Sequence, residues 1–129
     1  MVNYTALALV GLGGALGSGL RYIIGVITAD IFPETRYPLG TIIVNIAGCL
    51  LIGLIVELFT SRNDLAPEWR LFVITGFLGG FTTFSAFGLE TVTLLRSGAA
   101  GSALISVALQ VVVGCLAVFL GGTLARALR

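Results

Sequence analysis

Residues 79–87 read GGFTTFSAF and lie near the middle of a long apolar segment. Two adjacent glycines and two adjacent β-branched threonines are poor helix formers. Each glycine in a helix interior costs about 1 kcal/mol relative to alanine, and threonine adds a smaller penalty. We therefore expect the helix to unwind here. Within a membrane, the freed carbonyls are tolerated only inside protein or beside water or an ion.

The composition is that of a membrane protein. Of the 129 residues, 57% are hydrophobic and only 10% are charged. A soluble domain of this size cannot hide so much apolar surface. Four apolar segments span roughly residues 5–30, 39–60, 70–95 and 99–125, and each reaches the ~20 residues that cross a bilayer as a helix. We expect an all-α membrane protein, one domain over residues 1–129, with four transmembrane helices and the third broken mid-membrane.

The positive charges are balanced between the two ends of these segments. All are arginine, four at the end that holds the N-terminus and three toward the other: Arg62, Arg70, Arg126 and Arg129 against Arg21, Arg36 and Arg96. Orientation in a membrane follows a bias in such counts, and here almost none exists. The balance permits a dual-topology antiparallel homodimer, although counts this small also arise by chance. The net charge of +1 offers no basic patch for nucleic acid.

Polar residues recur at helical spacing in the second and fourth segments. Thr41 and Asn45 are four apart, and so are Ser102, Ser106 and Gln110. Residues four apart share one face of a helix. A carboxamide in the membrane core needs a protein partner or water, because lipid cannot satisfy its hydrogen-bonding groups. Pore lining and hydrogen bonding between helices both fit this pattern.

Phe84 and Phe87 are three apart and share a face beyond the expected break. An aromatic ring has a negative face and a positive edge. Ring edges can therefore offer a weak positive field to an anion without a charge that would trap it. Packing in an apolar core is the ordinary alternative for such a pair.

The first segment carries small residues and one charge. Gly13 with Gly17, and Ala15 with Gly19, form small-xxx-small pairs that allow another helix to approach closely. Arg21 is costly in hydrocarbon and needs a carbonyl, a carboxylate or a wet pocket, unless it reaches the interface.

Three motifs together resemble the CrcB/Fluc fluoride channels: GTIIVN at 40–45, GFLGGFTTFSAFGLET at 76–91 and GSGLRY at 17–22. The resemblance covers the whole chain in length, number of spans and motif order. It implies a multi-pass protein of the cell membrane that exports fluoride passively from the cytoplasm. It also implies two pores in an antiparallel homodimer.

The resemblance also implies roles for particular residues. Asn45 lies on the pore, and Phe84 and Phe87 line the fluoride path. The remaining expected pore residues are Thr41, Thr83, Ser85, Ser106 and Gln110. Backbone carbonyls of Gly79 and Thr82 bind a structural Na⁺ at the dimer interface, and Arg21 serves a vestibule or anchors its helix. Ala86, Gly88 and Gly114 stand at positions where hydroxyl residues are frequent in the family. This difference affects which polar residues line the pore and does not affect the class of protein.

Two alternatives from other classes remain. A small dual-topology drug/proton antiporter has the same size, but it needs a titratable carboxylate inside the membrane. Glu90 could serve, although we expect it to pair with an arginine near one interface. A non-conducting assembly subunit would give the polar residues Asn45, Ser106 and Gln110 no function. No hydrolytic or redox constellation is present, so we do not expect an enzyme.

Overall fold

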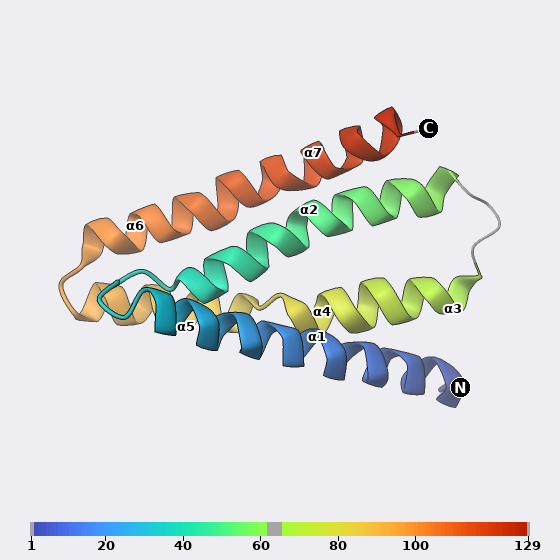
Figure 1. Ribbon diagram of the computed structural model, residues 1–129, viewed down its shortest axis with the longest axis horizontal. Helices are drawn as coiled ribbons and strands as arrows, with labels where there is room; N and C mark the ends of the chain where they lie inside the picture. The colour runs from blue at the N-terminus through green and yellow to red at the C-terminus, as the bar shows by residue number, and fades with distance from the viewer. Residues whose placement is uncertain (1, 62–65, 129) are drawn as a thin grey trace.

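The computed structural model describes residues 2–61 and 66–128, and their regular structure is helical (Figure 1). The helices are α1 (Tyr4–Ile31), α2 (Leu39–Ser61), α3 (Pro67–Arg70), α4 (Gly79–Phe81), α5 (Phe84–Arg96), α6 (Ala100–Ala108) and α7 (Gly114–Ala127). Two π-helical segments, η1 (Leu71–Leu78) and η2 (Leu109–Val113), connect α3 to α4 and α6 to α7.

Four stretches are long and apolar enough to cross a membrane: Tyr4–Ile31, Leu39–Thr60, Pro67–Arg96 and Ala100–Ala127. They confirm the expected all-α fold with four candidate spans. The third begins at 67 rather than at 70, because Pro67 starts α3 at its first helical position.

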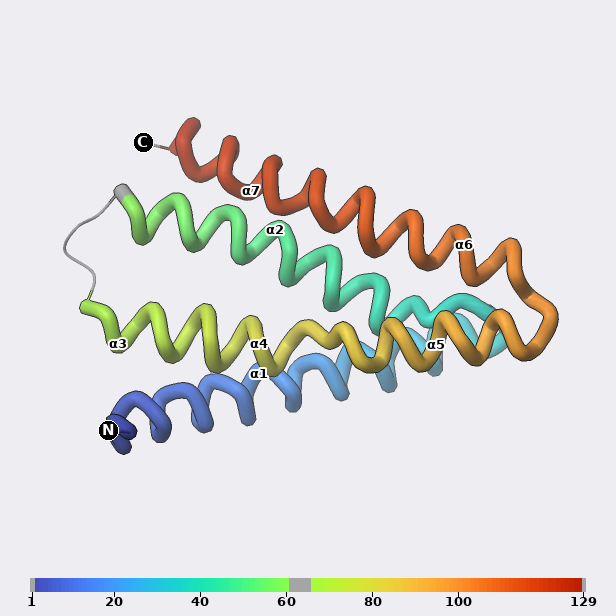
Figure 2. Tube along the Cα trace, turned by 180° about the vertical axis from the view of Figure 1, so that it is seen from behind, coloured from blue at the N-terminus to red at the C-terminus, as the bar shows by residue number. Residues whose placement is uncertain are grey.

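The two ends of the described chain lie at the same end of the molecule (Figures 1 and 2). That end also holds α3, whose last residue is Arg70, and the last turn of α7 with Arg126. The turn after Arg96 of α5 lies at the opposite end (Figure 2). Arg62 and Arg129, which the charge count includes, lie outside the described residues.

Glycines set how closely the helices pack. A Cβ at Gly17 would overlap the carbonyl oxygen of Phe77, and one at Gly53 would overlap that of Val118. These contacts hold α1 against η1 and α2 against α7, the two most extensive helix pairs. Ala15 is exposed and a Cβ at Gly19 would meet nothing within 4 Å, so in the described part of the chain this second pair makes no close helix contact.

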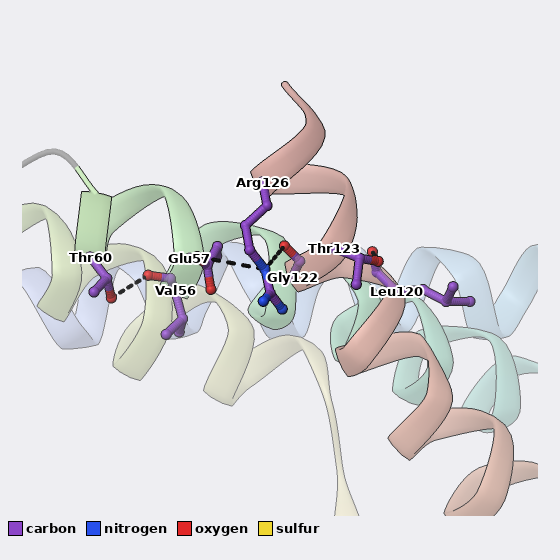
Figure 3. Close-up of polar contacts among 7 residues, drawn as sticks. All are labelled: Val56, Glu57, Thr60, Leu120, Gly122, Thr123 and Arg126. Atoms are coloured by element: carbon purple, nitrogen blue, oxygen red, sulfur yellow. Dashed lines mark hydrogen bonds and ion pairs between the residues drawn. The ribbon is translucent and has the colours of Figure 1, made fainter. Parts of the chain in front are cut away.

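At the end of the molecule that holds the termini, α2 and α7 are joined by a polar contact (Figure 3). The Arg126 Nε lies 3.8 Å from Glu57 Oε1 and donates to the Gly122 carbonyl at 3.3 Å. Exposed ion pairs of this kind contribute only about 0–1 kcal/mol. Thr60 and Thr123 return their hydroxyls to carbonyls of their own helices. The Arg126–Glu57 pair therefore links the two helices, while the two threonines bond within their own helices.

Candidate functional site: an uncharged cavity beside Thr82 and Thr83

The unwinding expected over residues 79–87 is confined to Thr82 and Thr83, which form a two-residue extended step between α4 and α5, whereas Gly79 and Gly80 stay helical in α4. Thr82 has φ −89° and ψ 162°, and Thr83 has φ −154° and ψ 119°. The Thr83 hydroxyl accepts from the Ala86 amide at 3.2 Å and so caps the start of α5. The Thr82 hydroxyl donates back to the Leu78 carbonyl at 3.0 Å.

Asn45 of α2 holds the extended step in place. Its Oδ1 accepts from the Thr83 amide at 2.8 Å, and its Nδ2 donates to the Thr83 carbonyl at 3.1 Å. The side chain therefore satisfies both backbone groups of a residue that has left the helix. Unpaired, those groups would carry the cost of a buried backbone donor and acceptor.

Gln110 and Ser106 continue this hydrogen-bonded chain from the fourth span. Asn45 Nδ2 donates to Gln110 Oε1 at 2.7 Å, and Gln110 Nε2 donates to Ser106 Oγ at 3.2 Å. Gln110 lies in η2, where the helix is locally widened. Single turns of π-helix often occur at functional sites. The structure thus brings together three of the predicted pore residues.

Arg21 of α1 has found a backbone partner. Its Nε donates to the Gly80 carbonyl at 3.1 Å, two residues before the extended step begins at Thr82. A guanidinium at the carboxyl end of a helix also meets a favourable dipole. Of the interpretations left open above, a carbonyl partner is the one found.

Thr41 and Glu90 lie apart from this group. The Thr41 hydroxyl donates to Glu90 Oε1 at 2.6 Å, and both residues line a separate cavity of about 300 Å³. Within residues 2–61 and 66–128, the other Glu90 oxygen is buried without a partner, and no ion pair involves this residue. The expected pairing of Glu90 with arginine is not found among these residues. Thr41 is a short hydroxyl donor within reach, whereas Arg96 is exposed beyond it at the end of α5.

A cavity of about 360 Å³ opens beside the extended step. Seven residues named from the sequence line it: Asn45, Gly79, Thr82, Thr83, Phe84, Phe87 and Gln110. Its described lining residues carry no formal charge at neutral pH. Ser106 is only 1% exposed and lies behind Gln110, while Ser85 contacts the Thr83 hydroxyl at 3.3 Å and lies outside the lining. Cys49 also lines the cavity, and its spacing of four from Asn45 could have identified it.

The phenylalanine pair forms one wall of this cavity. The ring centroids of Phe84 and Phe87 lie 5.4 Å apart with an interplanar angle of 45°. At this angle the pair is neither flatly stacked nor edge-to-face. Phe84 is 83% exposed in the single chain, so the cavity is open on this side.

Four helices apolar enough to cross a membrane, with an uncharged cavity lined by carboxamides, hydroxyls and phenyl rings, define a multi-pass membrane protein. Residues 8–122 match the family model described as CrcB-like protein, Camphor Resistance (CrcB). The chain therefore belongs to the CrcB family, as its motifs predict.

Curated relatives are similar over nearly their whole length. The chain is 47% identical over 126 residues to the "Fluoride-specific ion channel FluC" of Agrobacterium fabrum, which covers 98% of both chains. It is 43% identical over 118 residues to the protein of that name in Methylobacillus flagellatus, with 92% of both chains covered. Because these relatives are membrane channels, the predictions of a multi-pass cell-membrane protein and of no enzymatic activity are confirmed.

Proposed function

We propose that this protein is a fluoride-selective channel that lets fluoride leave the cytoplasm passively and so lowers its toxicity. The relatives named above support the ion. The observation that carries the mechanism is the uncharged cavity lined by two carboxamides and two tilted phenyl rings. The antiporter is not favoured, because Glu90, the carboxylate considered for proton exchange, lines a different cavity.

The physical argument concerns hydration. Fluoride holds its water tightly, so a pore must replace that shell with hydrogen-bond donors and other positive groups. A fixed cation at the constriction would bind the ion too strongly to release it, whereas conduction needs sites that both admit and release. Amide hydrogens and ring edges meet this requirement, since each contributes a partial positive charge.

We further propose that two chains assemble antiparallel and form two pores. The near balance of arginines supports insertion in both orientations. The 83% exposed ring of Phe84 supports a second chain that closes the open side of the cavity. In this assembly the extended step of each chain lies at membrane depth, where only protein, water or an ion can cover its carbonyls.

We propose that the backbone carbonyls of Gly79 and Thr82 bind a structural Na⁺. The Thr83 amide donates to Asn45 and the Ala86 amide donates to the Thr83 hydroxyl. The Thr83 amide is therefore not available to the Gly79 carbonyl, four residues earlier. In the same way, the Ala86 amide is not available to the Thr82 carbonyl. Carbonyl oxygens are hard ligands that suit Na⁺, so the residues fit the ion. Na⁺ bound there would neutralise the partial negative charges of carbonyl oxygens from two antiparallel chains.

The sodium proposal is tested by exchange of Na⁺ for N-methylglucamine in the buffer of the purified protein. We expect the unfolding temperature of the dimer to fall and to recover when Na⁺ is returned. An unfolding temperature that does not depend on Na⁺ would remove the proposal and leave the channel function in place.

Liposomes that contain the purified protein test the function directly. We expect rapid efflux of trapped fluoride, measured with a fluoride electrode, and much slower efflux of chloride under the same gradient. Efflux equal to that of empty liposomes would contradict the proposal. Uptake of an organic cation driven by a proton gradient would instead support the antiporter.

A further inference from the structure

The two carboxamides of the cavity have different hydrogen-bonding states. We propose that Gln110 donates the hydrogen bond that meets the anion, while Asn45 is a positioning residue that holds the extended step. This assignment rests on the proposed channel function. It gives different roles to Asn45 and Gln110, which are both expected from the sequence to line the pore.

Asn45 has no hydrogen left to offer. A carboxamide carries two N–H donors and one carbonyl acceptor. Nδ2 donates to the Thr83 carbonyl and to Gln110 Oε1, at 3.1 and 2.7 Å, while Oδ1 accepts from the Thr83 amide at 2.8 Å. An anion could reach an Asn45 hydrogen only by displacing one of these bonds.

The orientation of both carboxamides follows from one backbone group. The Thr83 amide can only donate, so the atom that faces it must be Oδ1 of Asn45. Nδ2 is then turned toward Gln110 and requires an acceptor there, which places Oε1 against it. Gln110 Nε2 therefore points away from Asn45, toward Ser106.

Gln110 keeps one hydrogen free. Its Nε2 carries two hydrogens, one of which is donated to Ser106 Oγ at 3.2 Å. The second has no hydrogen-bond partner within residues 2–61 and 66–128, and the side chain lines the cavity beside Phe84 and Phe87. Ser106, 1% exposed, is too buried to meet an ion and holds the Gln110 side chain in place.

The chain offers an unusually selective probe, because Gln110 is its only glutamine. Protein made with glutamine labelled by ¹⁵N in its side chain gives one NH₂ group in an NMR spectrum. We expect fluoride, and much less chloride, to shift one of its two proton resonances strongly. The resonance of the proton bonded to Ser106 should move less.

Two substitutions separate the roles. Gln110→Met keeps the length of the side chain and removes its amide, so we expect fluoride efflux to slow roughly tenfold to a hundredfold, the range for loss of a hydrogen bond to a charged group. Its unfolding temperature should fall less than that of Asn45→Ala, because it removes one acceptor of Asn45 and leaves both bonds of Asn45 to Thr83 in place. Asn45→Ala releases the backbone of Thr83, so we expect a lower unfolding temperature, while fluoride still shifts the Gln110 resonance.

The outcomes distinguish this assignment from the proposed function. Rapid efflux from the parent with an unmoved Gln110 resonance, or with a Gln110→Met variant as fast as the parent, would overturn the assignment. A fluoride-dependent shift of Gln110 in a parent that shows no efflux would support the binding role and contradict the channel.

Discussion

Single side chains at the Thr82–Thr83 step satisfy backbone groups that the missing turn of helix leaves unpaired. Arg21 donates to the Gly80 carbonyl, and Asn45 pairs with both groups of Thr83. A buried backbone group without a partner costs about 1–3 kcal/mol. Arg21 and Asn45 therefore stabilise the extended backbone, which the weak helix propensity of this segment allows but does not require. That shape places Phe84 and Phe87 on the cavity wall.

The contribution of the aromatic wall can be measured with a matched pair of phenylalanines. Phe84→Ala removes a ring that lines the cavity, whereas Phe119→Ala removes an exposed ring of α7 that does not. An aromatic contact contributes about 0.5–1.5 kcal/mol, so we expect Phe84→Ala to slow fluoride efflux by about tenfold. Phe119→Ala should retain the parent rate in the same liposome assay. Equal rates for the two variants would contradict a role for Phe84 in the path.

Helix packing in this molecule depends on close approach of backbones. Lipid is as apolar as leucine, so membrane helices associate through tight packing and hydrogen bonds rather than through the hydrophobic effect. Gly17 allows α1 to contact η1, and Gly53 allows α2 to contact α7. The π-helical segment η1 precedes the Thr82–Thr83 step in the chain, and η2 follows it. Together they carry Ile74, Leu78 and Gln110 into the cavity lining.

Two glycines of α1 provide a test at the level of the element. A Cβ at Gly17 would overlap the Phe77 carbonyl oxygen, whereas one at Gly11 would meet nothing within 4 Å. We expect Gly17→Ala to push α1 away from η1 and lower the unfolding temperature clearly. Gly11→Ala should leave it unchanged or raise it, because alanine favours a helix by about 1 kcal/mol over glycine. Circular dichroism of the two variants in the same detergent makes the comparison, and an equally stable Gly17→Ala would show that the contact is dispensable.

At the scale of the whole molecule, the arginine count predicts no strong preference for one orientation. Both ends of the described chain lie at one end of the helices (Figure 1). The sequence predicts a near-even division of the arginines, four toward that end and three toward the other. Since orientation follows that division, the proposed assembly needs no second gene product to supply an inverted copy.

Dual insertion predicts labelling from both sides of the membrane. The native thiols are first removed as Cys49→Ala and Cys115→Ala, and Ala100→Cys then places one thiol on an exposed residue at the start of α6. In intact cells we expect an impermeant maleimide to label about half of the protein, since an even charge balance gives no orientation bias. Permeabilised cells should label fully. Complete labelling, or none, in intact cells would contradict the antiparallel dimer.

Much of this architecture follows from local properties of the chain. Four apolar stretches of sufficient length predict four spans, because hydropathy and length alone decide whether a helix suits a bilayer. Paired glycines and threonines predict the loss of helix at Thr82 and Thr83, since backbone propensity is local. The spacing of Phe84 and Phe87 predicts that they share a face.

The partners of the polar side chains depended on the tertiary structure. Asn45 bonds to residues 38 and 65 positions away, and Arg21 bonds to one 59 positions away. Thr41, on the same helical face as Asn45, bonds instead to Glu90 and lines another cavity. Helical spacing places residues on a face but does not determine which distant group will meet them. Which hydrogen of which carboxamide stays free is decided by those distant neighbours, because each side chain turns to satisfy the groups packed against it.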